Sequence, residues 1–139
     1  MKITKIKLLK NIEEDKKNLN KFLSENKSAT KTFRYFNKRE YDVINNHIYT
    51  ALYFNNDNIL GYGHLDKDNN TVWLGIMVSD KYRGLGIGKK IMTDLLNNYN
   101  GEITLSVDKK NISAINLYKS KNFIKIEENN NIIIMKLKK

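Results

Sequence analysis

A glycine-rich segment from Arg83 to Gly88, with the sequence RGLGIG, has the residue types and spacing of a phosphate-binding site. Glycines at alternate positions let successive backbone N–H groups turn toward one anion, and a helix that follows adds the positive end of its dipole. Arg83 can supply a paired cation. The segment follows an apolar run, Thr71 to Val78, and opens into an amphipathic helical pattern. It therefore predicts a strand, loop and helix that hold a phosphorylated ligand.

Two other phosphate-binding loops share this logic but need a different spacing. A P-loop requires Gly at the position of Arg83 and Ser or Thr at the position of Lys90. A dinucleotide fingerprint beginning at Gly84 requires its third glycine at the position of Lys89. It also requires a carboxylate about 20 residues later, which the run Ile103 to Ser106 lacks. Neither of these loop classes fits the chain.

The glycine segment resembles the pyrophosphate loop of the GCN5-related N-acetyltransferases (GNAT family), whose pattern is Arg/Gln-x-x-Gly-x-Gly/Ala. Arg83, Gly86 and Gly88 fill this pattern. The resemblance implies acetyl-CoA as the cofactor, with its pyrophosphate on the glycine N–H groups and its pantetheine arm on the end of the preceding strand. The cofactor-binding residues expected there are Ile76, Met77, Val78, Arg83, Gly84, Leu85, Gly86, Ile87, Gly88 and Lys89.

A second motif downstream resembles the family's Asn-x-x-Ala-x-x-x-Tyr-x-x-x-Gly-Phe segment. Asn111, Ala114, Tyr118 and Phe123 match it, and Asn122 stands where glycine is usual. Asparagine is the next most tolerant residue of the left-handed turn that ends a helix, so the departure is mild. In the family the Asn touches coenzyme A and the Tyr lies near its sulfur. The resemblance therefore adds Asn111 and Ala114 to the expected cofactor site.

Acetyl transfer needs a proton donor for the departing thiolate and a proton acceptor for the amine. Tyr118, a phenol with a reference pKa of about 10, is the expected general acid. Several family members carry a Glu on the fourth strand. This chain has none there and carries Trp73 on that strand instead. His64 is the expected base, since its ordinary pKa of about 6.5 suits a proton acceptor at neutral pH. Asp66, Glu40 and His47 are the alternatives.

In the family, the loop between the first two helices lines the acceptor cleft. The acceptor site is therefore expected beside that loop. Arg34, Tyr35 and Trp73 are the candidate contacts, although large aromatic residues also suit the core. Arg34 would suit a phosphate or carboxylate. A weak similarity to transferases encoded beside surface-polysaccharide enzymes suggests an amino-sugar nucleotide as acceptor. A protein or peptide amine, and a non-catalytic CoA-binding module, remain open.

Composition limits the remaining possibilities. A chain of 139 residues is expected to form a single domain, residues 1–139, as a monomer or homodimer. No apolar run approaches the roughly 20 residues of a membrane span, and the N-terminus lacks the apolar core of a signal peptide, so we expect a cytoplasmic protein without membrane contact. The absence of cysteine excludes thiolate metal sites and an acyl-cysteine intermediate, and we expect no metal and direct transfer. The net charge of +10 is scattered, with no nucleic-acid module, and suits an anionic cofactor.

Hydrophobic periodicity and turn signals predict an α/β fold. As the resemblance implies, the sheet should be mixed, mostly antiparallel and flanked by helices, in the order β-α-α-β-β-β-α-β-α-β-β. The expected strands are Lys2–Leu9, Ile48–Phe54, Ile59–Leu65, Thr71–Val78, Glu102–Val107, Phe123–Glu127 and Ile132–Leu137, and the expected helices are Glu13–Ser24, Thr32–Asn46, Leu85–Tyr99 and one from Asn111 through Tyr118.

Overall fold

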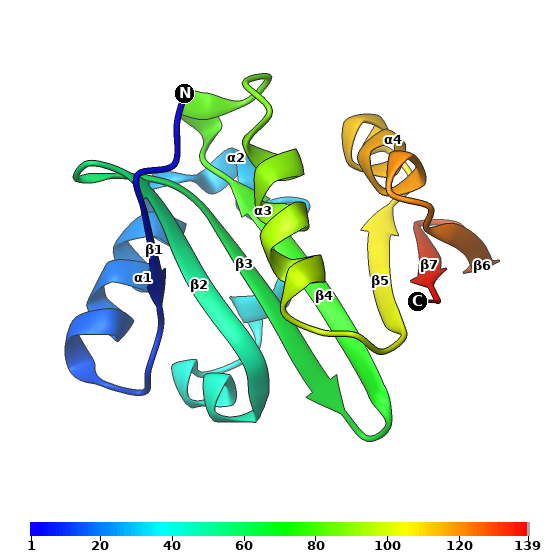
Figure 1. Ribbon diagram of the computed structural model, residues 1–139, viewed down its shortest axis with the longest axis horizontal. Coiled ribbons are helices and arrows are strands. Elements are labelled where there is room, and N and C mark those ends of the chain that lie inside the picture. The colour runs from blue at the N-terminus through cyan, green and yellow to red at the C-terminus, as the bar shows by residue number, and fades with distance from the viewer. Residues whose placement is uncertain (139) are drawn as a thin grey trace.

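The computed structural model describes residues 1–138 as one seven-stranded sheet with the strand order β1-β2-β3-β4-β5-β7-β6 (Figure 1). Only β4 and β5 run parallel, and all other neighbours are antiparallel. The mixed, mostly antiparallel sheet is therefore confirmed. The elements are β1 Lys5–Leu8, α1 Glu13–Glu25, α2 Lys27–Thr30, η1 Tyr35–Asn37, η2 Tyr41–Asn46, β2 His47–Asn55, β3 Asn58–Asp68, β4 Thr71–Val78, η3 Asp80–Tyr82, α3 Ile87–Asn97, β5 Ile103–Asp108, α4 Ile112–Ser120, β6 Ile124–Glu128 and β7 Ile132–Leu137.

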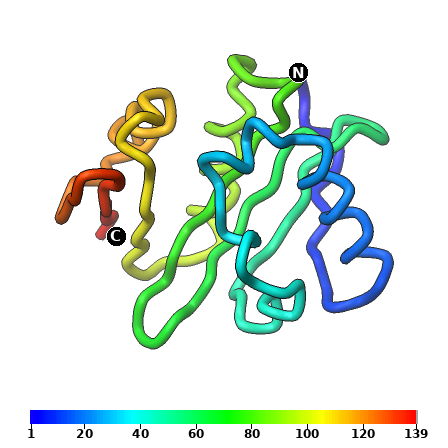
Figure 2. Tube along the Cα trace, turned by 180° about the vertical axis from the view of Figure 1, so that it is seen from behind, coloured from blue at the N-terminus to red at the C-terminus, as the bar shows by residue number. Residues whose placement is uncertain are grey.

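Helices cover both faces of the sheet and form a separate core on each. Helices α3 and α4 pack on one face, where Ile91, Leu95 and Ile115 join inward-facing strand residues such as Leu65 and Leu105. Helices α1 and α2 cover the other face, seen in front of the strands in Figure 2. Because side chains alternate along a strand, each central strand contributes to both cores. No helix in residues 1–138 is long and apolar enough to span a membrane.

The predicted helix over Thr32–Asn46 is wrong. The structure instead has the short helix α2 in Lys27–Thr30, followed by the 3₁₀ turns η1 and η2. Phe33 and Phe36 of this segment pack against the core on the α1 face without a continuous helix. The apolar spacing therefore reflected contact with the sheet, which an irregular segment also satisfies.

The other element boundaries differ by a few residues. Helix α3 begins at Ile87 rather than Leu85, because Gly84 and Gly86 have positive φ angles of 77° and 79° and cannot continue a right-handed helix. Asn122 has a φ of 73° at the end of α4, so the expected left-handed turn is confirmed. Strand β1 is shorter than expected and begins at Lys5.

The sheet opens between β4 and β5. These parallel strands pair only at Trp73 and Thr104, and beyond that point they diverge (Figure 1). The N–H of Ser79 donates to Leu60 O at 2.8 Å, continuing the β3–β4 ladder. Since alternate residues of a strand bond to opposite neighbours, the backbone groups of Ile76 and Val78 face away from β3 and into the gap. An extended ligand could bond to this edge.

Candidate active site

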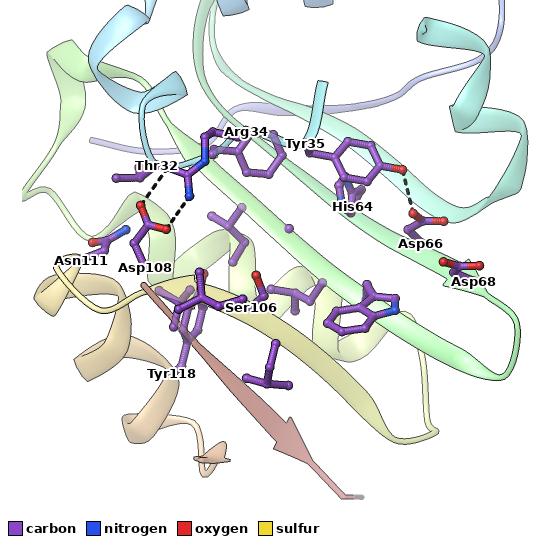
Figure 3. A pocket seen from close by; sticks show the side chains of 18 of the residues that line it. Thr32, Arg34, Tyr35, His64, Asp66, Asp68, Ser106, Asp108, Asn111 and Tyr118 are labelled. Atoms are coloured by element: carbon purple, nitrogen blue, oxygen red, sulfur yellow. Dashed lines mark hydrogen bonds and ion pairs between the residues drawn. The ribbon is translucent and has the colours of Figure 1, made fainter. Parts of the chain in front are cut away.

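Two cavities of about 540 and 520 Å³ meet at the opening of the sheet. The sheet cavity lies over β3, β4 and β5 beneath the segment that follows α2 (Figure 3), and the loop cavity lies between the glycine segment and α4. Both are of the size that holds a small molecule or part of a cofactor. We call their shared border the junction, and the residues lining both cavities are Thr32, Phe33, Ile76, Asn111 and Tyr118.

The glycine segment leaves space for a ligand. A Cβ atom added to Gly84 or Gly86 would meet nothing within 4 Å, so the backbone there borders open space. The N-terminus of α3 has no side-chain cap, and its first N–H groups are therefore available to an anion. Three basic residues and no acidic residue line the loop cavity, namely Arg83, Lys89 and Lys110. This chemistry fits a phosphorylated ligand.

Asp80 connects the glycine segment to helix α2. Its carboxylate accepts hydrogen bonds from the backbone N–H groups of Ser28 and Ala29, and an ion pair of 3.3 Å joins it to Arg83. The Arg83 side chain remains 52% exposed, so it can still meet an anion. Helix α2 and the glycine segment are thereby tied together.

Asn111 begins α4 at the junction. Its Oδ1 accepts a hydrogen bond of 3.3 Å from the N–H of Ala114, which caps the helix. No hydrogen bond from its Nδ2 to any residue of 1–138 is present, so this amide group is available to a ligand. Ala114 lines the loop cavity beside it.

Tyr118 lies on α4 where the two cavities join, with only 8% of its surface exposed. Its ring contacts Phe123, with the ring centres 6.0 Å apart. Burial raises the pKa of Tyr118 to about 12, so the phenol stays protonated at neutral pH. No side chain of residues 1–138 bonds to its hydroxyl, which can therefore donate to a ligand.

His64 lines the sheet cavity but is 2% exposed. Its Nδ1 lies 2.6 Å from the hydroxyl oxygen of Tyr62. Burial, the neighbouring His47 and then Arg39 lower the pKa of His64 well below its ordinary value. A histidine with so low a pKa is neutral at pH 7 but is a weak proton acceptor, which counts against the expected role as base.

Tyr35 connects three polar side chains at the far end of the sheet cavity. Its hydroxyl donates to Asp66 Oδ2 at 2.7 Å (Figure 3). The same hydroxyl lies 2.8 Å from His47 Nε2. Its single proton goes to Asp66, so His47 must donate from Nε2. The guanidinium of Arg39 lies 4.2 Å from the centre of the Tyr35 ring. Burial and then the bond to Asp66 raise the pKa of Tyr35.

Arg34 closes the sheet cavity near the junction. Its guanidinium forms two hydrogen bonds with Asp108, of 2.8 and 3.1 Å, and so joins the segment after α2 to the end of β5 (Figure 3). The sequence identified Arg34 but not its partner. Because Asp108 already neutralises Arg34, this arginine is not a free cation for an acceptor phosphate.

Strand alternation brings the remaining polar residues to the same face. His64, Asp66 and Asp68 alternate along β3, and Trp73 lies opposite Asp66 on β4. Ser106 and Asp108 alternate along β5 in the same cavity. The period of two in each strand could have identified Asp68 and Asp108, which the sequence analysis missed. Glu40 and Leu85 line neither cavity, although both were candidates.

A family model described as the acetyltransferase (GNAT) family matches residues 9–123. The chain therefore belongs to this family, and it is an acetyl-CoA-dependent N-acetyltransferase, as the sequence predicted. A search of curated proteins found no match.

Solved structures with the same fold extend over nearly the whole chain. A Pyrococcus horikoshii protein is 23% identical, with a TM-score of 0.72 over 97% of this chain and 99% of that one. Spermidine N-acetyltransferase from Vibrio cholerae, solved with CoA and spermine, is 16% identical, with a TM-score of 0.74 over 96% and 95%. The ribosomal-protein-S18-alanine N-acetyltransferase of Escherichia coli is 15% identical, with a TM-score of 0.72 over 96% and 92%.

Proposed function

We propose that this enzyme transfers an acetyl group from acetyl-CoA directly to the primary amine of a small molecule in the sheet cavity. The observation that carries the proposal is the junction, where a basic cavity suited to the cofactor meets a second cavity beside the Tyr118 hydroxyl. A cavity of about 540 Å³ suits a small acceptor.

The charges of the sheet cavity favour a cationic acceptor over an amino-sugar nucleotide. Three carboxylates and two guanidinium groups line it, and one of those guanidinium groups, on Arg34, already binds Asp108. Asp66 and Asp68 have no ion pair with any basic residue of 1–138. Trp73 opposite Asp66 adds an aromatic surface, which also attracts a cation. An acceptor with a second positive charge fits this end.

Bound acetyl-CoA supplies an activated thioester whose carbonyl carbon is attacked by the amine. The glycine segment and the N-terminus of α3 hold the pyrophosphate, and the free edge of β4 at Ile76 and Val78 holds the pantetheine arm. Tyr118 donates a hydrogen bond, and finally a proton, to the departing sulfur. Asp66 takes one proton of the acceptor's ammonium group through water before the attack, because among the alternatives to His64 it is the only residue that lines the sheet cavity. The second proton leaves the nitrogen as the amide forms, and water returns a proton to Tyr118 to replace the one given to the sulfur.

The cofactor site is tested by thermal unfolding with and without acetyl-CoA. A ligand at about 100 times its dissociation constant adds roughly 2.7 kcal/mol to the stability of the folded state. Gly86→Asp should abolish this shift, because it places a carboxylate against the phosphates. Gly86→Asn is the matched control, since it has a similar size and tolerance of positive φ without the charge, and it should keep part of the shift. An equal shift in wild type and Gly86→Asp would contradict the assignment.

The acceptor class is tested with a panel of amines at fixed acetyl-CoA concentration, comprising a diamine, a matched monoamine, an amino-sugar nucleotide and a peptide with a free N-terminus. We expect the highest kcat/KM for the diamine. Asp68→Asn should reduce that preference without affecting the monoamine. Faster acetylation of the peptide would favour the protein acetyltransferase alternative. Cofactor binding without transfer to any amine would favour a non-catalytic module.

A further inference from the structure

Tyr62 fixes the proton of His64. Tyr62 is fully buried, and the contact of 2.6 Å with His64 Nδ1 is the one side-chain hydrogen bond that its hydroxyl makes within residues 1–138. Leaving a buried hydroxyl proton without an acceptor costs about 1–3 kcal/mol. Tyr62 therefore donates and His64 Nδ1 accepts. In a neutral imidazole the remaining proton is then on Nε2.

The Nε2 atom of His64 lies over Gly75 of β4. A Cβ atom at Gly75 would be only 2.5 Å from Nε2 and 2.9 Å from Cε1 of Phe33, so glycine makes room for the imidazole at this position. Phe33 belongs to the junction, and Gly75 precedes Ile76, whose backbone faces the gap between β4 and β5. The nitrogen is thus next to the place where the two cavities meet.

This nitrogen belongs to a side chain that lines the sheet cavity. Within residues 1–138 it has no hydrogen-bond partner, and the one buried side-chain nitrogen or oxygen atom without a partner is Asp15 Oδ1. His64 Nε2 therefore keeps some solvent-accessible surface, although the residue as a whole is 2% exposed. An N–H donor left free at the border of the substrate cavity points to an acceptor atom on a ligand.

The groups around the ring keep it neutral. The imidazole of His47 lies 4.7 Å away and the ring of Tyr35 lies 4.4 Å away, measured between ring centres. Arg39 adds positive charge nearby, and the carboxylate of Asp66 is already bonded to Tyr35. Burial is the largest cause of the low pKa of His64, followed by His47 and Arg39.

We propose that His64 is a fixed hydrogen-bond donor whose Nε2–H binds an oxygen atom of a substrate at the junction. It is then not the base that accepts the amine proton. The inference rests on the proposed function for the identity of the ligand. The oxygen belongs either to the thioester carbonyl or to the acceptor, and both offer the same hydrogen-bond acceptor to an N–H group. Preorganised donors of this kind act in many enzymes by stabilising charge on such an oxygen.

The protonated nitrogen can be observed without any substrate. In protein labelled with ¹⁵N-histidine, long-range ¹H–¹⁵N correlation spectra should show His64 with a protonated Nε2 and a bare Nδ1, unchanged between about pH 5.5 and 8. Tyr62→Phe is the matched control and should weaken this tautomer preference, because it removes only the donor. A bare Nε2, or titration near the ordinary pKa of about 6.5, would overturn the proposal. This readout stands even if no acceptor is found.

Kinetics of two His64 variants separate a donor from a base. The side-chain amide nitrogen of Gln can occupy the place of Nε2 and donate, but it cannot accept a proton at neutral pH. We expect His64→Ala to lose about 100-fold in kcat/KM and His64→Gln to recover most of that loss. A loss in kcat assigns the bond to the thioester oxygen, and a rise in acceptor KM assigns it to the acceptor. Equal loss in both variants, with a changed pH–rate profile, would overturn the proposal.

Discussion

At the scale of single residues, Tyr118 illustrates how burial changes a role that sequence alone suggests. The motif placed a phenol near the sulfur, and its ordinary pKa of about 10 made it a convenient acid. In the structure, burial raises the pKa of Tyr118 to about 12. The phenol is therefore a weaker acid than expected but a permanent hydrogen-bond donor. Its effect should come mainly from the bond it makes to the departing sulfur.

Tyr118→Phe should lower kcat by about 100-fold, since it removes a single positioned proton donor. The dissociation constant of acetyl-CoA, measured by calorimetry, should change little because the ring is retained. Tyr99→Phe, which removes a phenol that lines neither cavity, is the control and should leave kcat unchanged. In wild type, the rate should not decline below about pH 10 through ionisation of Tyr118, because activity needs the protonated form. An undiminished kcat in Tyr118→Phe would remove it as the donor.

At the scale of elements, the strands and the long helix were predictable and the segment after α1 was not. Strands β2, β3 and β4 are separated by asparagine-rich turns, and Asn56 and Asn69 in those turns have positive φ angles. These signals are local, so they can be read from the chain. The path of residues 31–46 instead depends on bonds to distant residues, such as those of Arg34 to Asp108 and Tyr35 to Asp66. No local pattern encodes such partners.

The pair of Arg34 and Asp108 gives this segment a function that can be tested. Arg34→Ala should release it from β5 and raise the acceptor KM, while the cost in stability should stay below about 1 kcal/mol because the pair is partly exposed. The double variant Arg34→Asp with Asp108→Arg restores the charges in reverse order and should recover part of the affinity. A double variant as impaired as the sum of the two single variants would show that the pair does not act as a unit.

At the scale of the whole molecule, the positive net charge does not reveal that the charged residues lining one cavity are basic and those lining the other are mainly carboxylates. The net charge of +10 suggested an anionic cofactor, and the loop cavity is indeed lined by basic residues. The carboxylates of the sheet cavity could not be located in the same way, because Asp66 and Asp108 line one cavity only once the sheet has formed. Net charge determines the long-range electrostatic field, but the position of each acidic and basic side chain depends on the fold.

The stability of the whole molecule should depend on pH through its two histidines. Burial lowers the pKa of His47 to about 4 and that of His64 well below its ordinary value, so the unfolded chain binds more protons than the folded one below about pH 6.5. Stability should therefore fall as pH decreases from 6.5, by up to about 1.4 kcal/mol per pH unit for each histidine.

Urea unfolding between pH 7 and 5.5 measures this dependence. Glu128 contributes little to the slope in that range, because two lysines lower its pKa to about 2 and its contribution is lost as the pH falls through its ordinary value of 4.5 toward 2. His47→Gln should reduce the slope by about half. A slope equal to that of wild type would show that His47 is not buried in its neutral form.

The single residue pair that joins β4 to β5 leaves the edge of β4 beyond Trp73 without a neighbouring strand. Beyond this pair the backbones of β4 and β5 diverge in Figure 1, although β5 and α4 share one hydrophobic core with β3 and α3. A pantetheine arm bonded to the free edge of β4 would act as a temporary eighth strand between β4 and β5. CoA could then leave only after its hydrogen bonds to β4 break, so the strength of these bonds contributes to the rate of product release.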